Sequence, residues 1–231
     1  MKADSVGFTL FDLLGYLLPG SVVLFGASVL EATFLEESAL GVWRLSENWL
    51  FSMVAAYFLG HIAHSIGRFL KGKLFDSFLS TRPYRSKVLS VPLKKALVKD
   101  FPDVDLVGEA ARPLDRFMFA DLFLQIRGGT QDRHILMALV SFHKASMVAF
   151  AFLCVVILST LFAGGAVFSL APDTIFQAGW MHTLLMAVLC AGMSLSFLHG
   201  FRYFNATKND HVYAGYLSLR QREQQEASRG E

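Results

Sequence analysis

Ionisable side chains in the second apolar segment of the chain share one face of a predicted helix. His61, His64 and Arg68 follow one another within GHIAHSIGR at the spacings that align residues along a helix. Two imidazoles and a guanidinium can exchange protons or pair with a carboxylate, and the two histidines can ligate a metal ion. Antiparallel packing with the preceding apolar segment would bring Asp12 to a similar depth.

The ends of the other two apolar segments carry further ionisable residues. His143 and Lys144 come before the third segment, and His199 and Arg202 flank the end of the fourth. Charged groups in membrane segments are costly, and they usually face the bundle interior or a water-filled cavity. We call these eight residues the inner belt: Asp12, His61, His64, Arg68, His143, Lys144, His199 and Arg202.

Three interpretations of the inner belt stay open. The first is an interhelical clamp, in which Asp12 pairs with Arg68 or a histidine while the other residues reach toward the headgroups. The second is a proton or ion pathway through His61, His64 and Asp12. The third is a metal site, for which His61 and His64 are weak candidates because no HExxH-type glutamate accompanies them. We expect the clamp, with no bound metal, no cofactor and no catalytic residue.

Other motifs give little support for an enzyme. Arg127 and His134 are spaced like the R-x(4–6)-H pair of HEPN ribonucleases, but a Gly-Gly turn separates them. The sequence contains no GxSxG, Walker A or GxGxxG motif. Cys154 and Cys190 fall inside apolar segments, where thiols pack as small apolar groups. We therefore expect a non-enzymatic protein.

The elements that must position these residues are membrane-spanning helices. Hydrophobic residues make up 54% of the 231 residues and charged residues only 17%, whereas soluble domains are about 25% charged. Four stretches of 18 to 28 residues carry no charge, and about 20 apolar residues cross a hydrocarbon core ~30 Å thick. The predicted spans are Phe8–Leu30, Trp49–Gly67, Ala145–Phe168 and Gly179–Phe201. Pro19 and Gly20 predict a kink in the first span, or else two half-helices.

The distribution of charge predicts the orientation. Residues 68–133 contain 13 Lys and Arg against 8 Asp and Glu, and residues 202–231 add five basic residues, whereas 31–47 is acidic. Because basic residues collect in cytoplasmic loops, we expect both basic segments and both termini in the cytoplasm. Tryptophans favour the headgroup level, and three of them fall at the predicted outer boundary: Trp43, Trp49 and Trp180.

The chain is therefore predicted to be an all-α, polytopic membrane protein with a small helical cytoplasmic insert between spans 2 and 3. The predicted regions are 1–67, with the first pair of spans, the insert 68–133, 134–201, with the second pair, and the tail 202–231. Within the insert we expect the second span to continue up to Thr81. Three more helices should follow: Ser90–Phe101, Asp103–Ala111 and Pro113–Arg127.

The insert is too short to bury an independent core. We expect it to pack on the spans, on a second copy of the chain or on a partner. Lys94, Lys95 and Lys99 form a basic strip for contact with a partner or with anionic lipid, and because no nucleic-acid motif accompanies them, nucleic acid is not expected. In the fourth span, Ala187 with Ala191 and Gly192 with Ser196 predict close helix packing, within one chain or in a homo-oligomer.

Three segments of the chain, FDLLGYLLPG, YFLGHIAHSIGR and FRYFNATKNDHVY, resemble a group of bacterial membrane proteins. These proteins begin with F-D-x6-P-G, continue with G-H-x-x-H or G-H-x-x-Q, and often accompany phage-defence genes. The resemblance covers the spans and their inner edges. It implies the membrane component of an antiphage defence system that senses or damages the inner membrane. No recognised nucleotide-sensing domain accompanies the spans, which favours a protein that works with a partner.

The leading functional hypothesis is therefore a non-enzymatic, homo-oligomeric protein of the bacterial inner membrane. It would sense or perturb the bilayer and couple to a cytosolic partner through residues 68–133 and 202–231. One alternative is a channel or transporter subunit that uses the inner belt as its pathway. The other is a small membrane-bound, metal-dependent hydrolase built around His61, His64 and Asp12.

Overall fold

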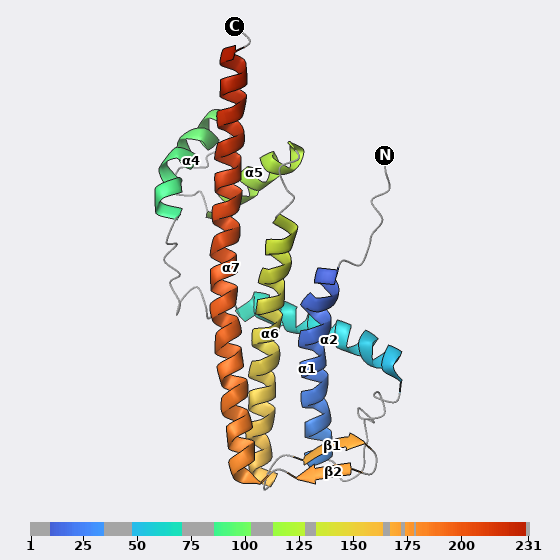
Figure 1. Ribbon diagram of the computed structural model, residues 1–231. Helices are drawn as coiled ribbons and strands as arrows, with labels where there is room; N and C mark the ends of the chain where they lie inside the picture. Colours follow the sequence, from blue (N-terminus) through green and yellow to red (C-terminus); the bar gives the residue numbers. More distant parts are fainter. Residues whose placement is uncertain are drawn as a thin grey trace. The chain divides into compact units, whose positions relative to one another are not determined.

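The computed structural model of the protein describes residues 10–34, 48–70, 86–102, 113–127, 133–163, 167–171, 174–177 and 179–229 (Figure 1). Its helices are α1 (Leu10–Phe34), α2 (Trp49–Leu70), α4 (Ser86–Asp100), α5 (Pro113–Ile126), α6 (Arg133–Thr160) and α7 (Trp180–Arg229). A 3₁₀ turn (Leu161–Ala163) and two short strands, β1 (Val167–Ala171) and β2 (Thr174–Gln177), lie between α6 and α7. The predicted all-α class is confirmed, and α1, α2, α6 and α7 are long and apolar enough to cross a membrane.

The chain forms two compact units. The span unit comprises residues 1–80 and 138–201, and the insert–tail unit comprises residues 81–137 and 202–231. The first contains α1, α2, the hairpin, most of α6 and the first part of α7. The second contains α4, α5 and the last part of α7. Residues far apart in the sequence therefore fold together in each unit.

In the span unit, α1 and α2 meet backbone to backbone. A Cβ atom added to Gly20 would collide with the carbonyl of Ala56, and one added to Gly60 would collide with the carbonyl of Tyr16. Pro19 is fully buried beside this contact. Helix α1 continues through Pro19, so the alternative of two separate half-helices is wrong.

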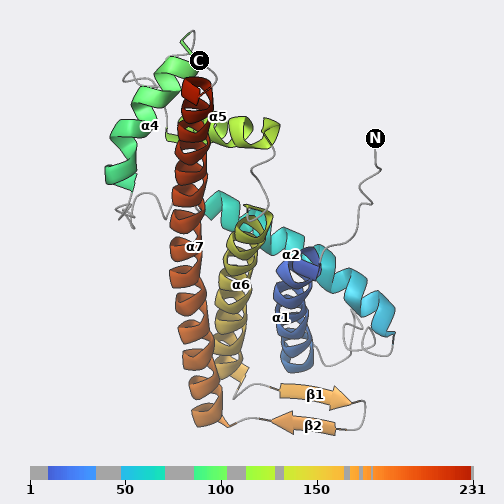
Figure 2. The ribbon, with the colours of Figure 1, turned by 45° about the horizontal axis from the view of Figure 1, so that its top comes forward.

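Helix α2 crosses its neighbours steeply. In two views of the molecule it runs across α1 and α6, whereas α1, α6 and the first part of α7 run alongside one another (Figures 1 and 2). The face of α2 that is buried consists of small residues only: Ala56, Gly60, Ala63 and Gly67. Small side chains permit the close crossing because they let the two backbones approach.

Helices α6 and α7 pack through apolar side chains in the span unit. Leu153 and Ile157 of α6 form a buried cluster with Ala187 and Cys190 of α7, and the Cys154 thiol donates a hydrogen bond to the Ala187 carbonyl at 3.4 Å. Ala187, which belongs to the first of the two predicted small-residue pairs, therefore packs within the chain. A Cβ added to Gly192, by contrast, would meet no described atom within 4 Å.

The predicted third span, Ala145–Phe168, is wrong at its end. Helix α6 stops at Thr160, and Phe168 lies in β1, where it pairs with Phe176 of β2 in an antiparallel hairpin. The helix ends just before Gly164 and Gly165 in the sequence, and glycine is a poor helix former. The strands are rich in β-branched and aromatic residues, and Pro-Asp between them is typical of a turn.

The helices of the insert agree in part with the prediction. Helix α5 begins at Pro113 as predicted and ends one residue early, at Ile126. The predicted helix Ser90–Phe101 starts too late, because α4 begins at Ser86 and includes Pro92 in its interior, although proline removes a helical hydrogen bond there. The predicted helix Asp103–Ala111 and the continuation of the second span beyond Leu70 lie outside the described residues.

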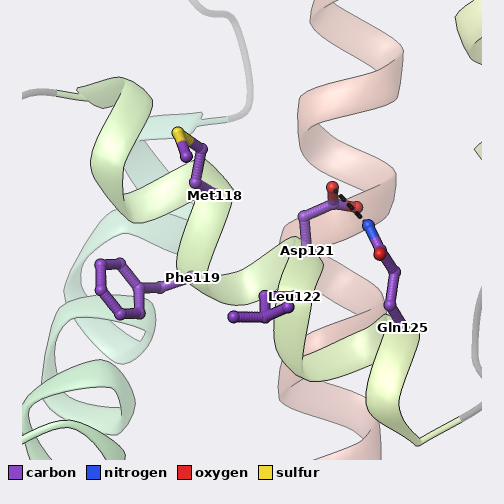
Figure 3. Close-up of a pocket in the computed structure, with 5 residues that line it drawn as sticks. All are labelled: Met118, Phe119, Asp121, Leu122 and Gln125. Carbon is purple, nitrogen blue, oxygen red and sulfur yellow. Dashed lines mark hydrogen bonds between the residues drawn. The ribbon is translucent and has the colours of Figure 1, made fainter.

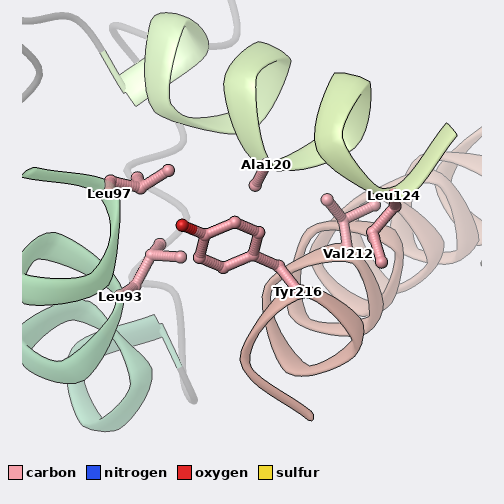
Figure 4. Packing of buried hydrophobic residues seen from close by; sticks show 6 residues of the cluster. All are labelled: Leu93, Leu97, Ala120, Leu124, Val212 and Tyr216. Atoms are coloured by element: carbon pink, nitrogen blue, oxygen red, sulfur yellow. The ribbon is translucent and has the colours of Figure 1, made fainter. Parts of the chain in front are cut away.

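The insert and the tail share one apolar core. The Tyr216 ring extends from α7 toward Leu93 and Leu97 of α4, with Ala120 of α5 beside it (Figure 4). All four side chains are buried, and Leu97, Ala120 and Tyr216 are completely buried. The insert thus obtains its core from the C-terminal part of α7, a packing partner that the sequence did not suggest.

Candidate functional site

The crossing of α1 and α2 gathers aromatic and imidazole rings in the span unit. The ring of Tyr16 stacks on His61, with centroids 3.8 Å apart and planes 14° apart. Tyr57, one helical turn before His61, meets the same imidazole edge-on at 4.6 Å. His61 is therefore held between two phenol rings, one from each helix.

His64 connects this ring cluster to α6. Its imidazole lies edge-on to Tyr16 at 5.6 Å and forms a hydrogen bond with the backbone of Ser141, and Lys144 lies close enough to act on it electrostatically. The aliphatic stem of Lys144 passes over α2 at Gly67, where an added Cβ would come within 2.7 Å of Cγ. Among the described residues, the buried Nδ1 of His64 has no hydrogen-bond partner.

Of the other members of the inner belt, Arg68 also lies close enough to His64 to act on it electrostatically, whereas His143 faces another helix. His143 points to α7, where its ring occupies the space over Gly200, and its Nδ1 donates to the Leu139 carbonyl at 2.8 Å. Arg68 and His199 are exposed. Asp12 lies in α1, but its side chain is outside the described residues. Arg202 belongs to the insert–tail unit, and its Nε and Nη2 are buried without a hydrogen-bond partner among the described residues.

The ring cluster can act in two ways. Imidazole and phenol groups in contact can relay protons, and the same contacts tie three helices together through packing and hydrogen bonds. In the described part of the chain, no three His, Cys, Asp or Glu side chains gather closely enough to hold a metal ion. The sequence analysis missed Tyr16, Tyr57 and Ser141. Tyr57 was detectable, because it continues the face of His61 and His64 by one turn.

A second polar cluster closes one end of the insert–tail core. The buried Asp100 carboxylate of α4 accepts a hydrogen bond from the Tyr216 hydroxyl and forms an ion pair with Arg220. Arg220 also lies 3.3 Å from Glu223, which in turn pairs with Arg127 at 2.6 Å. The network joins α4, the end of α5 and α7, and it gives Arg127 of the R-x6-H pair an ion partner. The side chain of His134 is outside the described residues.

Burial affects the phenols of this unit. The apolar surroundings raise the pKa of Tyr216 to about 12, and the neighbouring Glu223 carboxylate acts in the same direction. Burial also raises the pKa of Tyr213. Both phenols therefore stay protonated at physiological pH, and Tyr216 remains a hydrogen-bond donor to Asp100.

The basic strip lies on the outer side of α4. Lys95 and Lys99 are exposed and Lys94 is half-buried, while Leu93 and Leu97 on the opposite side enter the core. Lysines beside a buried stripe are typical of a solvated amphipathic helix. The structure therefore leaves the strip accessible to a partner or to lipid.

Helix α5 exposes an apolar stripe that the sequence analysis missed. Met118, Leu122 and Ile126 recur every fourth residue and are 57%, 49% and 73% exposed. A pocket of about 260 Å³ opens beside Met118 and Leu122, with Asp121 and Gln125 in its wall. In this wall the Gln125 amide donates to the Asp121 carboxylate at 3.2 Å (Figure 3). An exposed apolar patch next to a pocket is typical of an interaction site.

Comparison with known protein families, curated proteins and solved structures finds no match to this chain.

Proposed function

We propose that this chain is a non-enzymatic, homo-oligomeric protein of the bacterial inner membrane that senses or perturbs the bilayer and couples to a cytosolic protein. The observation that carries the proposal is the shared core of insert and tail. Leu93, Leu97 and Tyr216 bury apolar surface in a unit separate from the spans. A chain with only an anchoring role would not need such a folded unit outside its membrane helices.

The proposed orientation places both termini and the insert–tail unit in the cytoplasm. It rests on the excess of Lys and Arg in residues 68–133 and 202–231, which is the feature that retains loops on that side. In a variant lacking Cys154 and Cys190, a thiol reagent added outside intact cells should label Ser38→Cys and not Ser86→Cys. External labelling of Ser86→Cys would contradict the orientation.

The α5 stripe is the proposed docking surface for the cytosolic partner. Its three apolar side chains extend over two helical turns, which suits a partner that presents an apolar helix or extended segment. The pocket beside Met118 and Leu122 has room for one large side chain of that partner. The resemblance to proteins encoded near phage-defence genes suggests that this partner belongs to an antiphage defence system.

A photocrosslinking amino acid tests this surface in living cells. Placed at Leu122, it should yield one covalent adduct with a cytosolic protein. Placed at Val98, an exposed apolar position on α4, it should not yield that adduct. Absence of any protein adduct from Leu122, or the same adduct from both positions, would contradict the proposed docking surface.

The homo-oligomer is supported by the outward small residues of α7. Gly192 and Ser196 are exposed in the single chain, and small residues allow close helix association in membranes. The mass of the purified protein in mild detergent should exceed that of one chain. Gly192→Leu should lower this mass, because the bulky side chain separates the helices. A monomeric mass of the unaltered protein at all concentrations would contradict the proposal.

A proton or ion pathway is the second candidate, favoured by the contact of Tyr16 and Tyr57 with the imidazoles. Proteoliposomes with a proton gradient distinguish it from the clamp. If the cluster conducts, His61→Ala and His64→Ala abolish proton flux while the protein still folds. If it is a clamp, Asp12→Asn and Arg68→Gln each lower the melting temperature, the double variant recovers it, and no flux is seen.

A further inference from the structure

The closest described contacts of helix α2 lie in the first half of each of its neighbours α1 and α6. On α1, which begins at Leu10, the contacts lie at residues 16–20, and on α6, which begins at Arg133, they lie at residues 141–144. Both views show α2 crossing at this level, with its start part-way along the bundle (Figures 1 and 2). By contrast, α7 starts at the far end of the bundle, beside the hairpin.

The length of α2 limits what such a crossing allows. Its 22 described residues make a helix ~33 Å long at ~1.5 Å per residue, which scarcely exceeds the ~30 Å hydrocarbon core. Such a helix reaches both surfaces only when it stands nearly upright. Because α2 lies steeply across α1 and α6, it covers only part of the bilayer thickness, at the level of Tyr16 and Lys144.

The outward face of α2 is suited to lipid acyl chains. Opposite the small buried residues it exposes Phe51, Phe58, Ile62 and Phe69, and the sequence from Asn48 to Gly67 carries no charge. The first part of α7 in the same unit exposes similar apolar residues, among them Leu184 and Val188. The two surfaces therefore require the same apolar solvent.

The contact of α2 with α1 combines a direct approach of the two backbones with a cluster of rings. Side-chain ridges and grooves normally fix the crossing angle of two helices. At Gly20 and Gly60 there are no such ridges, because each glycine lies directly against a backbone carbonyl. Beside them, the Tyr16 ring supplies the side-chain contact with His61 and His64. The thickness of the surrounding bilayer acts on this angle, since helices adjust to hydrophobic mismatch by tilting.

We propose that α2 is an obliquely inserted helix, covered by acyl chains mainly of the cytoplasmic leaflet, that tilts about the Gly20–Gly60 contact as bilayer thickness changes. The leaflet is named on the proposed orientation, and the tilt is the device by which the proposed sensing of the bilayer would occur. The sequence pattern alone predicts a different arrangement, with Trp49 and Trp180 both at the outer headgroup level.

These two tryptophans provide a matched test. They begin α2 and α7 and are 70% and 64% exposed, so each can be retained as a sole fluorophore after Trp→Phe changes at the other two positions. The full chain is placed in phosphatidylcholine vesicles that carry bromine either near the headgroup or at mid-chain. Short-chain and long-chain lipids then vary the thickness, and fluorescence quenching reports the depth of each indole.

We expect mid-chain bromine to quench Trp49 more strongly than headgroup bromine, and the reverse for Trp180. The depth of Trp49 should shift between thin and thick bilayers, while Trp180 stays at the headgroup level. Shallow quenching of both tryptophans would overturn the oblique insertion. A deep Trp49 that does not shift with thickness would overturn the tilting. Either failure leaves the docking of a partner on α5 intact, because the crosslink from Leu122 is measured separately.

Discussion

Helix α2 of the span unit and the core of the insert–tail unit bury different kinds of side chain. In the span unit, the buried face of α2 consists of Ala and Gly, and its phenylalanines point outward. In the insert–tail unit, Leu97 and Tyr216 are fully buried. Water drives apolar residues together, but lipid supplies no such force between helices, so close backbone contact takes its place. The difference is the one expected if α2 lies in lipid and the insert–tail core lies in water.

The polar groups of the two units are also held by different kinds of contact. In the span unit, His61 and His64 are held by ring contacts with Tyr16 and by the backbone of Ser141. In the insert–tail unit, Asp100 and Arg220 form a buried ion pair that Glu223 and Arg127 extend to the surface. Each unit should therefore respond to a different kind of substitution.

The largest effect is expected at the glycine contact of the span unit. Gly60→Ala places a Cβ against the carbonyl of Tyr16, and neither backbone can yield without moving its helix. The free energy of unfolding should fall by an amount near the top of the ~1–3 kcal/mol range for overpacked cores. Thermal unfolding in detergent measures this change.

Gly15→Ala in α1 is the matched control, because Gly15 lies outside the proposed oligomer interface. Its added methyl group meets open space, and alanine is favoured over glycine in a helix by up to ~1 kcal/mol. The control should therefore be neutral or slightly stabilising. An equal loss of stability in both variants would mean that the α1–α2 contact is not specially close.

A smaller effect is expected at the ion pair of the insert–tail unit. Asp100→Asn removes one of the two carboxylates that Arg220 contacts. It should cost about 2 kcal/mol, less than the ~3–5 kcal/mol of fully buried pairs, because Glu223 remains and the Arg220 side chain is 25% exposed. The double variant Asp100→Asn/Arg220→Gln should recover part of the loss. Hydrogen exchange of α4 amides reports this unit separately. Additive losses in the double variant would contradict a direct pair.

The smallest effect concerns the titration of Tyr216. Burial raises its pKa to about 12, above the ~10 of an unfolded tyrosine, so the protonated phenol is the form that the fold favours. Its contribution to stability should be fully present below pH ~10 and should disappear as the pH rises through about 12. The difference in tyrosinate absorbance between the unaltered protein and Tyr216→Phe gives this pKa directly. A difference curve centred near 10 would place the phenol in water.

Much of the fold follows from the local pattern of the sequence. The spans could be predicted because charge-free stretches such as Asn48–Gly67 are a local property, and α5 because Pro113 and Gly128 mark its ends. The hairpin could not, since β1 and β2 have only five and four residues and no alternation long enough to detect. The steep crossing of α2 depends on Gly20 and Gly60 meeting, which residue spacing within one helix does not reveal.

The long-range parts of the candidate sites were the hardest to predict. Asp100 and Tyr216 are separated by 116 positions in the chain, and neither shows locally that it will meet the other. We predicted the inner belt only from the depth that each residue should have in the membrane. The depth of a residue does not determine which neighbouring helix its side chain faces. His143 and Lys144 are adjacent in sequence, yet the first packs at Gly200 of α7 and the second at Gly67 of α2.

Hydrogen exchange of α4 in the full chain tests the central claim, that insert and tail form one folded unit, most directly. Val212→Asp/Tyr216→Asp puts two carboxylates into the core that Leu93 and Leu97 complete, and Ala214→Asp/Ser218→Asp puts them at exposed positions of the same helix. The account predicts that α4 amides lose protection in the first variant only, while α6 amides between Ala145 and Thr160 stay protected in both. Unchanged protection of α4 in the first variant would show that the tail does not complete the core of the insert.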